Sequence, residues 1–270
     1  MRVVRVGAVS YLNTRPLVYG LKEQPGVSLS FDLPSVLAEK LRAGDIDVGL
    51  VPIVEYLRGV GESIIPGIGI ASDGDVRTVK LFSRVHPAQL GSVGVDPASR
   101  TSVALLRILL GERFGVTPDF HSLTADLRRM LQAHEGALLI GDAAFTDSGA
   151  PYVWDLGHGW KELTGLPFVY AAWVARAGVD VERVGGWLHD ALAAGMQHIE
   201  DIIHEAPPIP GAVAASMREY LTRTLHFSLG ARELRGIATF QKHCVRYNLV
   251  PACREIVLAA PVSELVTGSE

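Results

Sequence analysis

The chain has 270 residues, of which 48% are hydrophobic and 20% are charged. This composition is that of an ordinary globular protein with ample material for a core, so a disordered chain is excluded. The formal charge of −4 argues against a protein that binds the phosphate backbone of nucleic acids, and no apolar run is long enough to span a membrane.

The two cysteines, Cys244 and Cys253, belong to no CxxC pair and to no Cys/His cluster with the spacing of a zinc site. We therefore expect two free thiols and no metal. Residues 1–10 include two arginines, and their apolar part is too short for the core of a secretion signal. The expected location is the cytoplasm, with a mature form that starts near Met1.

The first half of the chain alternates segments that predict strands with segments that predict helices. β-branched and apolar runs predict strands at residues 3–9, 29–33, 47–52 and 76–84, and a glycine-rich section lies at residues 59–69. Capping residues, prolines in first turns and a closing glycine predict three helices. The first follows a cap at Asn13 or Thr14, has Pro16 in its first turn and runs to residue 21, and the others are residues 34–43 and 53–57. A break follows at residues 87–91, where we expect the chain to enter a second lobe.

The middle of the chain repeats this alternation, and the last third changes to helices alone. The expected strands of the middle are residues 92–96, 116–121, 137–142, 152–156 and 168–175. The expected helices are residues 99–115, 124–131 and 158–164, followed by 181–204, 213–225 and 231–247. The end of the chain, residues 267–270, is expected to be a frayed tail.

This pattern predicts an α/β protein with mostly parallel strands and a helical C-terminal third. The segment 168–175 is apolar on both faces and is expected to return the chain to the first lobe. We therefore expect a discontinuous first lobe of residues 1–86 and 174–270 and a second lobe of residues 87–173. Ligands of such folds bind where strands end and helices begin, so two facing lobes predict a cleft between them.

The first candidate site is the turn after the first strand. Ser10 and Asn13 offer neutral hydrogen-bond donors there, and Tyr11 offers a ring with a polar end. The start of the following helix favours an anion. The alternative is that Asn13 is only the cap of this helix, and the two interpretations have about equal weight.

The second candidate site is a similar turn with the hydroxyl groups of Ser99, Thr101 and Ser102. This turn offers a place for a carboxylate or a phosphate, although a plain helix cap explains it equally well. Two such turns on one cleft would suit a ligand with two negative ends.

Three acids end predicted strands: Asp142, Glu55 and Asp96. A carboxylate next to a bound dianion has a raised pKa, which suits a proton donor. Each acid is alternatively the cap of the next helix, and this is the favoured interpretation for Asp96. Two further residues are expected near the cleft: Ser83, at a strand end, and Trp173, whose ring would stack on a planar ligand unless it belongs to the core.

Other catalytic motifs are absent from the sequence. There is no HExxH pair, no Walker A loop, no complete dinucleotide fingerprint and no G-x-S-x-G elbow. Metal, nucleotide and serine-hydrolase mechanisms therefore have no support.

Several segments, in matching order, resemble the chorismate dehydratase (MqnA) family of the futalosine route to menaquinone. They are residues 9–17, 47–52 with 55–56, 99–102, 139–144, 155–157 with Trp160, and 164–171. The first and the last are specific, and the others are shared with a wider superfamily. The resemblance implies a two-lobe fold like that of type II periplasmic binding proteins. It also implies conversion of chorismate to 3-[(1-carboxyvinyl)oxy]benzoate with loss of water, without a metal or an organic cofactor.

With chorismate, a dicarboxylate, as the implied small-molecule substrate, the candidate residues acquire roles. Asn13 and Ser10 would orient the reacting groups, Thr101 and Ser102 would hold one carboxylate, and Asp142 or Glu55 would be the nearest titratable group. A carboxylate of the substrate is the alternative base. The expected lining also includes the following residues: Tyr11, Thr14, Ser83, Ser99, Gly141 and Trp173.

Two other functions stay open. One is the 1,4-dihydroxy-6-naphthoate synthase of the same pathway, a family with a catalytic histidine, for which only His121 lies near a predicted strand end. The other is a non-catalytic solute-binding protein of the cytosol. Whether the helical third covers the first lobe or forms the face of a homodimer is also open.

Overall fold

The computed structural model describes residues 3–146 and 149–259. The frayed tail expected at residues 267–270 lies outside this part. Alternating β-branched residues near the start of the chain form an inner strand of a first sheet with the strand order β2-β1-β3-β10-β4. Its strands are β1 (Val4–Ala8), β2 (Val27–Phe31), β3 (Val48–Pro52), β4 (Ser63–Ser72) and β10 (Phe168–Ala175).

Parallel pairing joins β1 to β2 and β3, so that Val6 lies opposite both Leu29 and Val48. By contrast, β10 runs antiparallel between β3 and β4, with Trp173 opposite Leu50. All eight residues of β10 except Ala171 are buried, as expected for a strand that is apolar on both faces.

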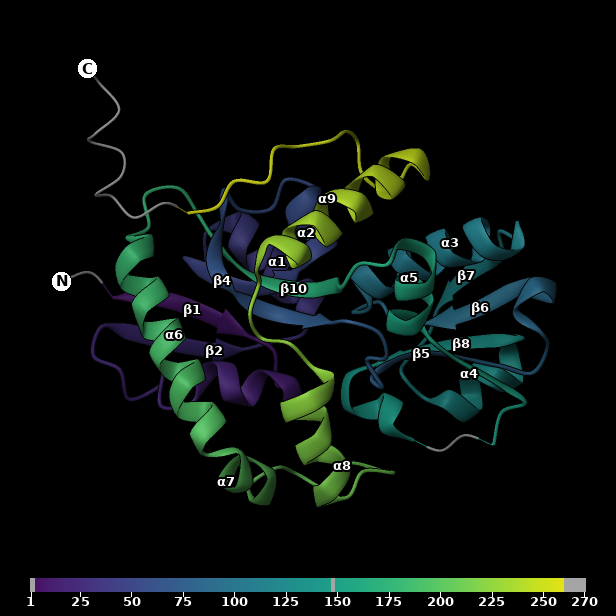
Figure 1. The fold of residues 1–270 in the computed structure, drawn as a ribbon, viewed down its shortest axis with the longest axis horizontal. Coiled ribbons are helices and arrows are strands. Elements are labelled where there is room, and N and C mark those ends of the chain that lie inside the picture. Colours follow the sequence, from purple (N-terminus) through teal and green to yellow (C-terminus); the bar gives the residue numbers. More distant parts are fainter. Residues whose placement is uncertain (1–2, 147–148, 260–270) are drawn as a thin grey trace.

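A second sheet lies beside the first, at the right of Figure 1, with the strand order β7-β6-β8-β5-β9. Its strands are β5 (Val79–Ser83), β6 (Ser92–Val95), β7 (Asp119–Ser122), β8 (Gly136–Ile140) and β9 (Tyr152–Asp155). The strands β6, β7 and β8 are parallel, and β5 is antiparallel to β8 and β9.

The chain passes between the two sheets at residues 73–78 and returns at residues 165–167. This differs from the lobe division after residues 86 and 173 that the sequence predicts. The physical reason is that β5 pairs its backbone with β8 and β9 of the second sheet, whereas the whole of β10 pairs within the first.

Helices cover both sheets. Around the first sheet lie η1 (Leu12–Val18), α1 (Pro34–Ala43), α2 (Ile53–Leu57) and α6 (Val181–Gln197). The second lobe contains η2 (Pro87–Gln89), α3 (Arg100–Phe114), α4 (Leu127–Ala133), η3 (Gly141–Phe145) and α5 (Leu156–Thr164). The glycines Gly44 and Gly115 end α1 and α3 with φ angles of 87° and 68°, which side chains rarely adopt.

Local chemistry explains where the helices depart from the predictions. The helix expected to follow a cap at Asn13 or Thr14 and to run to residue 21 is the 3-10 helix η1. It has Tyr11 as its N-cap, contains Pro16 as expected, and ends earlier, at Val18. The helix expected at residues 181–204 is divided at His198 into α6 and α7 (Ile199–His204). The next helix is α8 (Ala214–Glu219), which continues into the π-helical turn η4 (Tyr220–Thr224).

The last helix, α9 (Ala231–Arg246), packs against β10 (Figure 1). Its Phe240 lies edge-on against Phe168 of β10 and Trp160 of α5, with ring centroids 4.9 and 6.0 Å away. The Trp160 ring nitrogen donates to the Pro167 carbonyl at 3.2 Å, which satisfies its polar group in the core. The helical third therefore packs on both lobes. No helix in the described ranges combines the length and the apolar character needed to cross a membrane.

Candidate functional site

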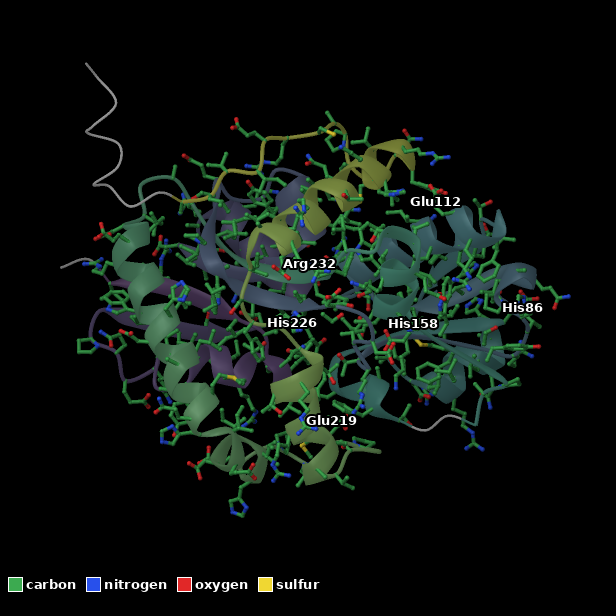
Figure 2. The ribbon with its side chains drawn as sticks, in the orientation of Figure 1. His86, Glu112, His158, Glu219, His226 and Arg232 are labelled. Atoms are coloured by element: carbon green, nitrogen blue, oxygen red, sulfur yellow. The ribbon has the colours of Figure 1, made fainter. Side chains whose placement is uncertain are left out.

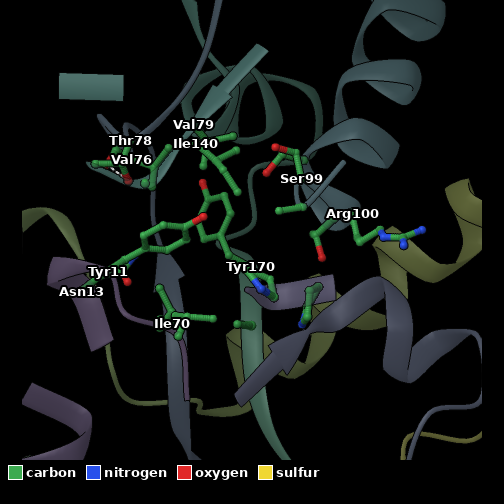
Figure 3. Close-up of a pocket in the computed structure, with 18 of the residues that line it drawn as sticks. Tyr11, Asn13, Ile70, Val76, Thr78, Val79, Ser99, Arg100, Ile140 and Tyr170 are labelled. Carbon is green, nitrogen blue, oxygen red and sulfur yellow. Dashed lines mark hydrogen bonds between the residues drawn. The ribbon is translucent and has the colours of Figure 1, made fainter. Parts of the chain in front are cut away.

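A pocket with about 610 Å³ of empty space, its open mouth included, lies where the carboxyl ends of β1 and β3 face the start of α3. Figure 3 shows the rings of Tyr11 and Tyr170 in its middle, with Asn13 on one side and Ser99 and Arg100 on the other. The first sheet and its helices contribute Val9, Tyr11, Asn13, Pro34, Leu50, Pro52, Ile70, Tyr170 and Ala171. The second lobe and the crossing segment contribute Val76, Thr78, Val79, Ala98, Ser99, Arg100, Thr101, Ser102, Ile140 and Gly141.

Asn13 reaches the pocket because η1 begins directly after β1. Its side-chain Nδ2 donates to the Tyr220 hydroxyl at 3.1 Å, and that hydroxyl lies 2.7 Å from the Thr78 Oγ1. Burial raises the pKa of Tyr220 well above its usual value, so the phenol is neutral. One tyrosine hydroxyl thus joins two residues that line the pocket.

Tyr11 lies against Gly141, and the close fit requires glycine there. A Cβ atom at Gly141 would be 3.1–3.2 Å from three carbons of the Tyr11 ring, and the φ angle of Gly141 is 61°. Burial, with smaller contributions from Asp96 and Asp142, raises the pKa of Tyr11 to about 12. Tyr11 is therefore a neutral phenol at physiological pH.

Tyr170 stands on β10 at the base of the pocket. Its hydroxyl lies 3.1 Å from the Ser72 Oγ, which donates to the Gly74 carbonyl at 3.0 Å, so that Tyr170 donates to Ser72. Burial raises the pKa of Tyr170 well above the ordinary value, and the nearby Asp155 adds to the effect. The two pocket tyrosines offer hydrogen bonds and ring faces, and neither is a base at neutral pH.

The start of α3 faces the pocket with unused hydrogen-bonding groups. The first N–H groups of a helix have no acceptor within the helix, and Ser99, the N-cap, makes no side-chain capping bond. The Ser99 Oγ is buried and has no hydrogen-bond partner in the part of the chain that the structure describes. The Thr101 hydroxyl accepts from the Val54 N–H at 3.3 Å, which ties α3 to α2 of the first lobe and leaves its hydrogen to be donated.

Asp142 does not line the pocket, although the sequence predicts it as an acid near the substrate. Its carboxylate accepts from the Leu12 N–H, at 3.1 and 3.3 Å for the two oxygens. The anion expected at the start of η1 is therefore the protein's own carboxylate, which links the second lobe to the first. Burial raises the pKa of Asp142, partly offset by the Leu12 N–H and the charge of Arg15.

This raised pKa gives a testable dependence of stability on pH. Because folding disfavours the ionised form of Asp142, its contribution to stability is lost as pH rises from the unfolded-state value of about 3.8 through the higher folded-state pKa. Asp142→Asn stays neutral and still accepts from Leu12. We expect the free energy of unfolding of the variant, relative to the wild type, to rise across that pH range and then level off. Urea unfolding at a series of pH values measures this, and a relative loss of stability with rising pH would contradict it.

Glu55 is likewise outside the pocket, although the sequence makes it a catalytic candidate. It is buried, its carboxylate receives the Arg58 guanidinium at 2.7 Å, and Arg42 lies 3.6 Å away. The Glu55 carboxylate thus links the end of α2 to α1 through two arginines, which is a structural role.

Glu55→Gln is therefore expected to lower the free energy of unfolding by about 1–3 kcal/mol, because Arg58 loses its charged partner. We expect turnover to stay within about twofold of the wild type. Denaturant unfolding and steady-state kinetics measure the two effects, with Glu62→Gln, at an exposed glutamate, as the control. A large fall in turnover at unchanged stability would restore Glu55 as a catalytic candidate.

The remaining predicted residues divide between the pocket and other places. Asn13, Tyr11, Ser99, Thr101, Ser102 and Gly141 line the pocket. Ser10 is exposed and borders a separate depression beside Arg15 and Tyr19, because the chain turns outward between β1 and η1. Thr14 is buried behind Asn13 and donates to its Oδ1 at 3.4 Å.

Three more expectations are corrected by the packing. The Ser83 hydroxyl bonds to the Val85 carbonyl at the far end of β5, away from the pocket. Trp173 is fully buried in the core, where its ring cannot stack on a ligand. Asp96 accepts from the Ala98 N–H at 2.8 Å in the loop before α3 and is not the cap of this helix, because the N-cap of α3 is Ser99.

Sequence reasoning missed Thr78, Tyr170 and Tyr220. Thr78 directly precedes β5, and Tyr170 lies inside a segment that was already specific for the resembled family, so both had a local signal. Tyr220 had none, because it belongs to the helical third and reaches Asn13 only through the fold. Among the described residues, no group of three or more His, Cys, Asp and Glu side chains has the geometry to hold a metal ion.

Comparison with known proteins identifies the family. The sequence model of a family described as menaquinone biosynthesis matches residues 4–246. The chain belongs to this family. A relative named chorismate dehydratase from Thermus thermophilus is 32% identical over 195 residues, which cover 65% of this chain and 71% of the relative. The chorismate dehydratase of Campylobacter jejuni is 27% identical over 175 residues, or 61% of this chain and slightly under two thirds (64%) of the relative.

Solved structures define the fold of this menaquinone biosynthesis protein. The periplasmic aliphatic sulphonate binding protein of Escherichia coli matches with a TM-score of 0.68 at 18% identity, over 97% of this chain and 93% of that one. The predicted family and the predicted fold, two α/β lobes like those of periplasmic binding proteins with a helical C-terminal part, are therefore confirmed.

Proposed function

We propose that this protein is a chorismate dehydratase, a hydro-lyase (EC 4.2.1.151) that converts chorismate to 3-[(1-carboxyvinyl)oxy]benzoate and water. One observation of the pocket carries the proposal: the start of α3, with the buried Ser99 hydroxyl that has no partner among the described residues, shares a mostly apolar pocket with the Asn13 amide. The names of the Thermus and Campylobacter relatives support it.

The proposed reaction removes water from the ring of the substrate. The C–O bond of the ring hydroxyl breaks, and the hydroxyl leaves with the electron pair of that bond. A neighbouring ring carbon loses its proton, so that hydroxide and proton together make water and the ring becomes aromatic. Much of the driving force lies in the aromatic product. The protein must therefore fix one conformer of the substrate, assist the leaving hydroxyl and exclude bulk water.

The start of α3 is suited to one substrate carboxylate. Free N–H groups and the helix dipole favour an anion there, and the Ser99, Thr101 and Ser102 hydroxyls add donors. These donors are neutral, and none of them is an acidic side chain that would repel the anion. The chain's net charge of −4 gives no overall attraction for a dianion, which leaves the local donors to bind it.

Asn13 and Thr78 are suited to the reacting end of the substrate. Both line the pocket from the side of η1 and the crossing segment, and both contact the neutral Tyr220 hydroxyl. An amide N–H aimed at the leaving oxygen stabilises the charge that develops on it. The Thr78 hydroxyl donates to the Val76 carbonyl at 3.4 Å and so adds a polar oxygen beside this amide.

None of the described residues that line the pocket is Asp, Glu, His or Lys. Asp142 is occupied by the Leu12 N–H and Glu55 by two arginines, and burial keeps Tyr11 and Tyr170 protonated. Of the bases considered from the sequence, this favours a carboxylate of the substrate itself. It would take the ring proton inside the pocket.

The same observation disfavours the naphthoate synthase alternative, which needs a histidine. His121, the one candidate, stacks on His134 with ring centroids 4.4 Å apart at the edge of the second sheet, and it does not line the pocket. The solute-binding alternative shares the fold and differs only in turnover. A cytoplasmic location and a homodimer stay predictions.

Proton NMR of purified protein with chorismate tests the proposal. We expect the ring signals of chorismate to be replaced by those of a meta-substituted benzoate with an intact enol ether. Saturable binding of chorismate without any product would favour the solute-binding alternative.

A further inference from the structure

Tyr220 lies behind the pocket, at a junction of four segments. It is fully buried at the start of the π-helical turn η4 and does not line the pocket itself. Its hydroxyl contacts Asn13 of η1 and Thr78 of the crossing segment, and its ring packs edge-on against Phe145 of η3 with centroids 5.1 Å apart. The helical third thus reaches two pocket residues through one side chain.

The direction of these hydrogen bonds follows from the donors available. The Asn13 Nδ2 can only donate, so the Tyr220 oxygen accepts. The single Tyr220 hydrogen is then free to be donated to the Thr78 Oγ1 at 2.7 Å. This arrangement fixes which end of the Asn13 amide faces Tyr220 and leaves the second Nδ2 hydrogen for another acceptor, whereas the Thr78 hydroxyl donates to the Val76 carbonyl at 3.4 Å.

A second contact joins the crossing segment to the end of α8, beside the contact of Thr78 with Tyr220. Glu219, next to Tyr220 and labelled in Figure 2, receives the Arg77 guanidinium through two bonds of 2.8 and 2.9 Å. Arg77, next to Thr78, has a φ angle of 64° and donates its backbone N–H to Asp155 at 2.7 Å. Residues other than glycine rarely adopt this backbone conformation. At Arg77 it is held by the contact of the side chain with Glu219 and by that of the backbone N–H with Asp155.

We infer that Tyr220 is a positioning residue for the reaction: its hydroxyl, itself held by Thr78, orients the Asn13 amide toward the substrate. The helical third is then part of the working site, and not only a cover for the sheets. This inference rests on the proposed function for its kinetic consequences, whereas the orientation of Asn13 concerns the free protein.

The first test is Tyr220→Phe, which removes the hydroxyl and keeps the ring against Phe145. We expect kcat for chorismate to fall about 10-fold with KM changed less than about twofold, because misplaced groups act mainly in the transition state. The matched control is Tyr56→Phe, at another fully buried tyrosine, whose hydroxyl accepts from the Val257 N–H at 2.9 Å outside the pocket. That variant should lose stability and keep its turnover.

A double-mutant cycle separates positioning from general damage. If Tyr220 acts through Asn13, adding Tyr220→Phe to Asn13→Ala should lower kcat by less than about twofold more. The full 10-fold fall in the Asn13→Ala background, or an equal fall in Tyr56→Phe, would overturn the inference.

Crystal structures of the wild type and of Tyr220→Phe give a result that does not depend on turnover. We expect the Asn13 amide to adopt a new rotamer in the variant. An unchanged position of this side chain would overturn the inference. A wild type that consumes no chorismate would overturn the proposed function alone, and the rotamer of Asn13 would still decide the role of Tyr220.

Discussion

Replacing Asn13 by Ala is expected to lower kcat for chorismate by about 100-fold or more, the size typical for loss of a group that positions or stabilises reacting atoms. The amide lines the pocket and is held by the Tyr220 hydroxyl at 3.1 Å. Its removal leaves the apolar walls and the start of α3 in place, so KM should change much less than kcat. Steady-state kinetics on chorismate measures both constants.

The neighbouring Arg15 provides a control for Asn13→Ala. Its guanidinium reaches the Glu205 carbonyl at 3.4 Å and borders the separate depression outside the pocket. Arg15→Ala should therefore keep the turnover of the wild type within about twofold. Undiminished dehydration by Asn13→Ala would remove Asn13 from the reaction altogether.

The second large effect is expected from Gly141→Ala. The added methyl group would lie 3.1–3.2 Å from the Tyr11 ring, so the ring must move within the pocket. We expect kcat/KM to fall by about 10- to 100-fold, since small displacements of groups around a substrate are costly. The variant should also lose about 1 kcal/mol of stability, because alanine is strained at a φ angle of 61°.

Gly115→Ala separates strain from the closing of the pocket. Gly115 has a φ angle of 68° at the end of α3, and a Cβ atom there would meet no atom within 4 Å. Its replacement should cost a similar amount of stability, measured by urea unfolding, and leave kcat/KM unchanged. Equal losses of kcat/KM in both variants would show that Tyr11 and Gly141 do not shape the site.

The sequence was sufficient for most of the fold because its signals are local. Alternating apolar runs, Pro34 in a first turn and Gly44 and Gly115 at helix ends all act over a few residues. The position of β5 was missed for the opposite reason. Residues 76–84 have the pattern of a strand in either sheet, and only pairing with β8 and β9 decides which one.

The candidate site follows the same division. Asn13, Tyr11, Ser99 and Thr101 were found because strand-to-helix turns meet at one edge of each sheet. Asp142 and Glu55 lie outside the pocket, because the end of a strand predicts where a side chain starts and not which groups it contacts. Asp142 meets the Leu12 N–H, a contact between residues 130 positions apart that no local pattern encodes.

The most direct test of the proposed function is the turnover of chorismate by the wild-type protein, measured from about pH 6 to pH 9 beside Asn13→Ala. The substrate carboxylates stay ionised across this range, and no protein group that titrates in it lines the pocket. We predict formation of 3-[(1-carboxyvinyl)oxy]benzoate with a kcat that is nearly independent of pH and is lost in the variant. Binding of chorismate without turnover at every pH, or equal rates in Asn13→Ala and the wild type, would contradict it.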